Sequence, residues 1–282
     1  MLPGGPAQVR AAKRGINRNM LYIFYFLICI AATTLGAISG IGGGVVIKPV
    51  MDAVSGMSVS TISFLSGCTV LAMSVVSMLR SRGGDVRIDP KKGTLLAVGG
   101  AIGGVVGKWV FDIVKTSFGN DGLVGTIQSI LMVILTLGVL VYVLNKARIR
   151  TLNVSNPIVC LSIGLGLGIL SSFLGIGGGP INLAVLYFFF SMDTKTAALN
   201  SLYIILFSQI ASFCTTLIQG KVPDFDIITL VVMAVGGILG GFIGRAFSKK
   251  MTGRQVDLLF RGMLILITAI SCYNLFHYAR ML

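Results

Sequence analysis

Two short glycine-rich runs interrupt an otherwise strongly apolar chain, and the second repeats the first. Residues 40–44 read Gly-Ile-Gly-Gly-Gly, and residues 175–179 repeat these letters 135 positions later. Glycine costs about 1 kcal/mol per residue relative to alanine in a helix, so each run should break the helix before it. Irregular backbone at membrane depth is tolerated only inside protein or beside a wet cavity. Matching breaks in two halves of a membrane chain therefore indicate the binding site of a transporter.

The composition is that of a membrane protein. Apolar residues make up 55% of the chain and charged residues 11%, and the mean hydropathy is +0.92. A soluble domain has about 25% charged residues, so this chain could not cover a surface that faces water. We therefore expect a multi-pass protein of the cell membrane (plasma or inner membrane), with bilayer lipid around it.

We predict an all-α integral membrane protein with eight long transmembrane helices and two short helices after the glycine-rich breaks. Each long apolar segment can cross the roughly 30 Å of a bilayer core at 1.5 Å per residue. The long segments are 19–39, 58–79, 93–114, 123–144, 156–174, 194–218, 226–247 and 256–278, and the short ones are 45–57 and 180–192. Ser58 and Asp193 are expected to cap the helices that follow them.

An internal repeat extends well beyond the breaks. A Gly-Gly-x-x-Gly-Gly-x-x-Gly pattern occurs at 99–107 in the first half and at 236–244 in the second. A cation, Lys108 or Arg245, directly follows each copy. Glycines four positions apart allow close contact between helices in lipid, so this pattern predicts tight packing. We divide the chain into a basic N-terminal tail (1–18) and two transmembrane repeats (19–146 and 147–282).

The sequence leaves two arrangements of the repeats open. If the short segments do not cross the membrane, each repeat crosses it four times and the repeats are parallel. If they do cross, each repeat crosses five times and the repeats are inverted. The positions of Lys and Arg fit both arrangements equally. Five extended residues cover about 16 Å and thirteen helical residues about 20 Å, so a break and its short helix together span a bilayer. This length favours the inverted five-plus-five repeat.

The net charge of +14 is concentrated in short segments between the apolar stretches. This pattern is typical of loops that obey the positive-inside rule and contact anionic lipid. It is also compatible with a positive field that concentrates a small anion at a pore mouth. Because the basic residues flank membrane spans and form no domain of their own, we expect no nucleic-acid partner.

In the inverted arrangement the short helices begin at the midplane. A helix N-terminus carries unpaired N–H groups and about half a positive charge, so two that meet there form an anion site. The expected substrate-binding residues are Gly42, Gly43, Gly44, Lys48, Ser66, Thr69, Gly177, Gly178, Gly179, Asn182, Asn200 and Ser201. We expect positive φ angles at Gly43 and Gly178. One alternative stays open for the breaks: they only allow helix packing, and the hydroxyl and amide groups bond between helices. Another stays open for Lys48, whose side chain could instead extend to a membrane interface.

Five segments carry a family resemblance. In each half, a glycine run is followed by a helix rich in small and hydroxyl residues. The segments concerned are 40–49, 63–69 and 82–86 in the first half, and 175–182 and 198–201 in the second. This doubled arrangement resembles the sulfite exporter TauE/SafE family of membrane permeases, over nearly all of the chain after residue 19. The resemblance implies transport of sulfite, sulfonates or other small sulfur-containing anions. Lys48, which stands where the second copy has Leu183, departs from the pattern.

Other functions have weaker support in the sequence. An intramembrane enzyme would need a Ser/His pair or clustered carboxylates, but the chain has one histidine, His277, and nine carboxylates mostly at span ends. We therefore expect no catalytic residues, no cofactor and no metal. An anion channel and a carrier of another small organic acid remain alternatives, and a homo-oligomer is compatible with the sequence. Lys108 and Asp112 are interpreted as a local ion pair, and no span centre carries an evident proton-relaying carboxylate.

Overall fold

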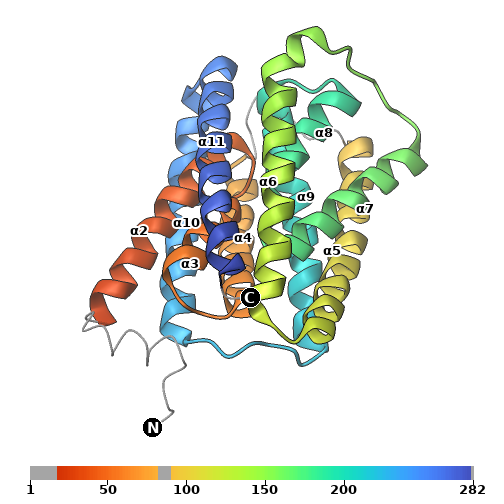
Figure 1. The fold of residues 1–282 in the computed structure, drawn as a ribbon. Helices are drawn as coiled ribbons and strands as arrows, with labels where there is room; N and C mark the ends of the chain where they lie inside the picture. Colours follow the sequence, from red (N-terminus) through yellow and green to blue (C-terminus); the bar gives the residue numbers. More distant parts are fainter. Residues whose placement is uncertain (1–17, 82–89, 281–282) are drawn as a thin grey trace.

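The computed structural model describes residues 18–81 and 90–280, and within these ranges every regular element is a helix (Figure 1). Most of the basic tail and the 82–86 segment lie outside the described residues. The long helices are α2 (Arg18–Ser39), α4 (Val59–Ser81), α5 (Pro90–Phe118), α6 (Asp121–Asn145), α7 (Pro157–Leu174), α9 (Thr194–Ile218), α10 (Ile227–Lys250) and α11 (Gly253–Ala279). The short helices are α3 (Gly44–Val54) and α8 (Pro180–Phe190), with a 3₁₀ turn, η1, at Lys146–Arg148.

The predicted set of elements is confirmed. In the described part of the chain, eight helices are long and apolar enough to cross a membrane. Their ends differ from the predicted ends by four residues at most. The expected caps are present: the Ser58 Oγ accepts from the Thr61 amide, and the Asp193 carboxylate accepts from the amides of Lys195 and Thr196.

The repeated glycine pattern packs helices backbone to backbone. A β-carbon at Gly99, Gly103 or Gly107 of α5 would overlap a backbone carbonyl of α7. The other glycines of the pattern, Gly100 and Gly104, lie against α9. The equivalent glycines of α10 lie against α2 and α4. The predicted packing role is therefore confirmed, and in each case the contact joins helices of different repeats.

The order of these contacts along the chain gives the helix directions. Successive glycines of α5 meet Leu161, Leu165 and Ile169 of α7 in ascending order, so α5 and α7 are parallel. By the same reasoning, α9 is parallel to α5. Helices α2 and α4 are both parallel to α10. By contrast, α6 and α11 are antiparallel, since Gly125 faces Tyr278 and the Thr268 hydroxyl donates to Thr136 over 2.9 Å (Figure 1).

Connections of only two residues join α5 to α6 and α10 to α11, so the helices of each pair are antiparallel. With the contacts above, this gives two sets of helices that run in opposite directions: α2, α4, α6 and α10 in one, and α5, α7, α9 and α11 in the other. The repeats are inverted, since α2 and its counterpart α7 point in opposite directions. Each short helix returns the chain, which lets α4 run parallel to α2 and α9 run parallel to α7.

Asp226 joins the start of α10 to α2. Its carboxylate accepts from the Thr229 amide and hydroxyl, and from the Tyr22 hydroxyl at 2.9 Å. Burial alone would raise the pKa of this carboxyl, but the hydrogen bonds from Thr229 and Tyr22 outweigh burial and lower the pKa below its usual value. The charged form is therefore the one that stabilises the fold.

We expect Asp226→Ala to lower the free energy of unfolding by about 1 kcal/mol at pH 7, because α10 loses its N-cap. Since the folded pKa is depressed, this contribution is present above the ordinary carboxyl pKa of about 3.9 and is lost as the pH falls through the folded pKa. Thermal unfolding in detergent at several pH values measures both effects. A difference between variant and wild type that grows as the pH falls would contradict this assignment.

Candidate functional site

The two glycine breaks meet in the core of the molecule. The Gly179 amide donates to the Ile41 carbonyl over 3.1 Å. A β-carbon at Gly44 would overlap the carbonyl oxygen of Ile176, which shows how closely the two backbones approach. The two runs that are 135 residues apart in the sequence thus form one structure, which we call the glycine crossing (residues 40–44 and 175–179).

The expected positive φ is confirmed at Gly178 and wrong at Gly43. Gly178 has φ +124°, whereas Gly43 has φ −69° and ψ −25°, an ordinary helical conformation. Gly43 is constrained for another reason, because a β-carbon there would overlap Thr33 of α2. Gly178 combines both constraints, since its β-carbon would also overlap the Ile205 side chain.

The glycine crossing contains buried amides without acceptors. Within the described residues, the backbone N–H groups of Gly42, Gly43, Gly177 and Gly178 donate no hydrogen bond. Nearly all buried backbone N–H groups in proteins are paired, so a cluster of unpaired ones is unusual. Helices α3 and α8 also begin at this point and direct the positive ends of their dipoles toward it. The crossing therefore offers donors to a ligand that accepts hydrogen bonds.

Three predicted side chains accompany these amides. Asn182, in the first turn of α8, is buried beside Gly178, and its Oδ1 has no partner. Ser66 and Ser201 lie one helical turn before Val70 and Ile205, whose side chains pack on Gly177 and Gly178 of the crossing. Both serine hydroxyls are fully buried and unpaired.

Two other predicted residues, although buried, face neighbouring helices. The Thr69 hydroxyl donates to the Leu65 carbonyl of its own helix, and the Thr69 backbone packs on Gly237 of α10. Asn200 lies one turn before Ile204, which packs on α5, and its Nδ2 donates to the Thr196 carbonyl. The contacts of Thr69 are packing and intrahelical contacts, whereas the buried Oδ1 of Asn200 has no partner among the described residues.

Lys48 is buried in an ion pair that we did not predict. It is 3% exposed, so it does not extend to a membrane interface, and its Nζ lies 2.8 Å from Asp52 Oδ2 one turn along α3. The Tyr278 hydroxyl donates to the other Asp52 oxygen over 3.1 Å. A cavity of about 10 Å³ adjoins the pair, with Gln128 among its lining residues.

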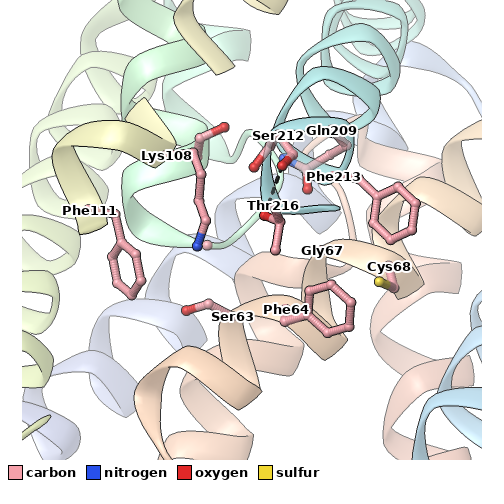
Figure 2. A pocket seen from close by; sticks show the side chains of 12 residues that line it. Ser63, Phe64, Gly67, Cys68, Lys108, Phe111, Gln209, Ser212, Phe213 and Thr216 are labelled. Atoms are coloured by element: carbon pink, nitrogen blue, oxygen red, sulfur yellow. Dashed lines mark hydrogen bonds between the residues drawn. The ribbon is translucent and has the colours of Figure 1, made fainter. Parts of the chain in front are cut away.

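A larger cavity of about 40 Å³ lies beside the glycine crossing, between α4, α5, α7 and α9 (Figure 2). Lys108 of α5 points into it, toward Ser63 and Thr216. Its other polar lining residues are Ser172, Gln209 and Ser212, and Phe64, Phe111 and Phe213 supply apolar surface. Gly175 joins this cavity to the crossing. We call it the Lys108 cavity.

Lys108 is the one charged residue among the described residues that line the Lys108 cavity. Lys108 lies 3.2 Å from Asp112, as predicted, and Asp112 is also 3.6 Å from Lys221, so one carboxylate faces two cations. The hydroxyls of Ser63 and Ser172 are buried and unpaired. A lysine with free hydroxyls beside it suits an oxyanion.

The sequence predicts only a local ion pair for Lys108. The repeat contained a signal that could have identified it, since both copies of the glycine pattern end in a cation. What the sequence lacked was the direction of the Lys108 side chain, which depends on how α5 packs between α7 and α9.

An inverted repeat with two broken helices that meet at its centre defines the transporter class of multi-pass membrane proteins. The model of the sulfite exporter TauE/SafE family matches residues 25–271, and the chain belongs to this family. It is 26% identical to the "Probable membrane transporter protein YunE" of Bacillus subtilis, over 88% of this chain and 96% of that protein. It is also 26% identical to a "Probable membrane transporter protein" of Haemophilus influenzae, over 89% and 95% of the two chains. No solved structure matches the chain.

These similarities confirm the resemblance read from the glycine runs. The protein is a multi-pass membrane protein of a transporter family.

Proposed function

We propose that this protein carries a small sulfur-containing oxyanion, sulfite or an organosulfonate, across the membrane and binds it at the glycine crossing, with the Lys108 cavity as the approach. The observation that supports this most directly is the set of four buried, unpaired glycine amides in the crossing. Gly175 of the crossing also lines the Lys108 cavity. The family assignment supports transport as the activity.

The chemistry of the site matches such a cargo. Sulfite and sulfonates present three oxygen acceptors around one sulfur atom, and the crossing supplies several backbone donors together with Asn182, Ser66 and Ser201. Backbone dipoles stabilise an anion without a permanent charge that would hold it too tightly for release. A cavity of about 40 Å³ holds roughly three water-sized groups, which favours a small ion.

Uptake by purified protein in liposomes tests this proposal. The panel contains sulfite, short organosulfonates, sulfate and small carboxylates, each against protein-free liposomes. We expect the sulfur oxyanions with three oxygens to be transported best. Preferential uptake of carboxylates would identify a carrier of another organic acid, and flux without saturation or counterflow would identify a channel.

We expect Lys108→Gln to weaken the apparent affinity for the anion about tenfold or more, because a hydrogen bond to a charged group is worth about 1.5–3 kcal/mol. Lys115→Gln is the matched control, since it removes an exposed lysine from the same helix. Concentration dependence of uptake measures both variants. Equal affinities for the two would place the anion outside the Lys108 cavity.

A further inference from the structure

Lys108 has an exact counterpart in the other repeat. Both Lys108 and Arg245 directly follow the last glycine of the repeated pattern, on the equivalent helices α5 and α10. These helices run in opposite directions, and each cation lies toward the C-terminal end of its own helix. The two cations therefore lie on opposite sides of the glycine crossing, one toward each end of the helix bundle.

Arg245 is buried without a counter-charge in the described part of the chain. Its residue is 7% exposed, its Nε has no hydrogen-bond partner, and no described carboxylate lies within 4 Å of its side chain. A buried cation costs several kcal/mol unless an anion and hydrogen bonds compensate it. The chain thus retains an expensive charge at this position.

Unpaired hydroxyls lie on the helix that faces Arg245. Thr69 and Met73 of α4 pack on Gly237 and Gly241 of α10, so the next turn of both helices places Ser77 opposite Arg245. Ser77 and Ser74 are both 0% exposed, and neither hydroxyl has a partner. Ser74 and Ser77 are the counterparts, 135 positions earlier, of Gln209 and Ser212 in the Lys108 cavity. The polar groups that line one cavity therefore recur on the other side.

Apolar side chains fill the space that is open on the Lys108 side. Leu202 replaces Gly67 at the equivalent position, and it forms a buried cluster with Ala37, Val70, Met73 and Ile205. Met78, the counterpart of Phe213, packs against this cluster. One side of the crossing thus has a cavity, whereas buried apolar side chains pack together on the related side.

We propose that Arg245, with Ser74 and Ser77, forms a second binding position for the transported oxyanion, and that this position accepts the anion when the Leu202–Met78 cluster opens. The inference rests on the proposed function and adds a second binding position to it. Lys108 serves cargo on one side of the membrane, and Arg245 serves it on the other.

Transport measured in both directions tests this inference. Proteoliposomes with one protein orientation are given sulfite from either side, and KM is determined for each direction. We expect Arg245→Gln to raise KM about tenfold or more for sulfite on the Arg245 side, and to leave KM within about twofold on the Lys108 side. Lys108→Gln should show the reverse. Lys249→Gln, which removes an exposed charge one turn further along α10, should change neither value.

Sidedness separates binding from a structural role, because a general distortion would change both KM values together. An equal change in both directions, or no change in either, would overturn the inference and leave the proposed function intact. Absence of sulfite and sulfonate transport by the wild type would refute the proposed function itself. If Arg245→Gln does not fold, Arg245→Lys keeps the charge, loses the planar donor set, and should raise KM on the same side alone.

Discussion

Replacing Asp52 with asparagine is expected to lower the free energy of unfolding by about 3–5 kcal/mol. Both partners of the Lys48–Asp52 pair are buried, since their side chains are 4% and 6% exposed. Removing one partner leaves the other charge buried without compensation, and this costs more than a surface pair contributes. The Tyr278 hydroxyl also loses the charge of its acceptor. Unfolding in detergent measures the change.

Two controls make this result specific. The double variant Lys48→Met with Asp52→Leu removes both charges and should recover most of the lost stability, because apolar replacement of a whole buried pair is often neutral. Asp224→Asn, at an exposed position, should change stability by about 0.5 kcal/mol or less. A double variant as unstable as Asp52→Asn would mean that the destabilisation does not come from an uncompensated Lys48.

The same double variant tests coupling. We expect transport to follow the anion gradient and the membrane potential, with no Asp52 proton relay. A stable double variant should therefore still transport under a pH gradient. If it binds sulfite normally but loses pH-driven transport, Asp52 is part of the coupling machinery.

Gly178→Ala is expected to abolish transport. Gly178 has φ +124°, which an alanine rarely adopts, and the added carbon would overlap the Ile205 side chain. It would also lie 3.1 Å from Asn182 Nδ2, so the substitution disturbs the proposed binding groups directly. Strain of about 1–3 kcal/mol plus overpacking of similar size would displace one break from the other. Uptake by protein normalised for folded amount measures the loss.

Gly166→Ala is the matched control in the same repeat. Gly166 lies inside α7, its φ is not positive, and no atom lies within 4 Å of an added β-carbon. Alanine there should stabilise the helix by about 0.5–1 kcal/mol and leave transport unchanged. Full transport by a folded Gly178→Ala variant would mean that the breaks serve packing alone, and that the anion binds elsewhere.

Most of the fold could be predicted from local features of the sequence. Long apolar segments, side-chain caps such as Asp193 and the glycine pattern each act within one or two helices, so their meaning does not depend on the rest of the molecule. The inverted repeat followed from a length argument, which the helix contacts confirm. The meeting of the two breaks followed from their equivalent positions in that repeat.

The side chains of the site were harder to predict, because their roles depend on the packing of distant helices. A hydroxyl on an apolar helix can stay buried and unpaired, as that of Ser66 does, or bond its own backbone, as that of Thr69 does, and the sequence alone does not separate these cases. Lys108 points into a cavity whose other walls come from α4, α7 and α9. The four-residue spacing of Lys48 and Asp52 could have predicted their ion pair. The hydrogen bond from the Tyr278 hydroxyl to Asp52 could not be predicted, because these residues are 226 positions apart.

The exchange of helices between the repeats bears on how the chain is assembled during synthesis. The glycine faces of α5 have no partners until α7 and α9 have emerged from the ribosome, and α2 and α4 wait for α10. A chain that stopped after residue 146 would expose these close-contact faces to lipid, which cannot follow their grooves. The first half is therefore inserted early but completed late, and its packing is complete only when α10, in the last fifth of the chain, has been synthesised.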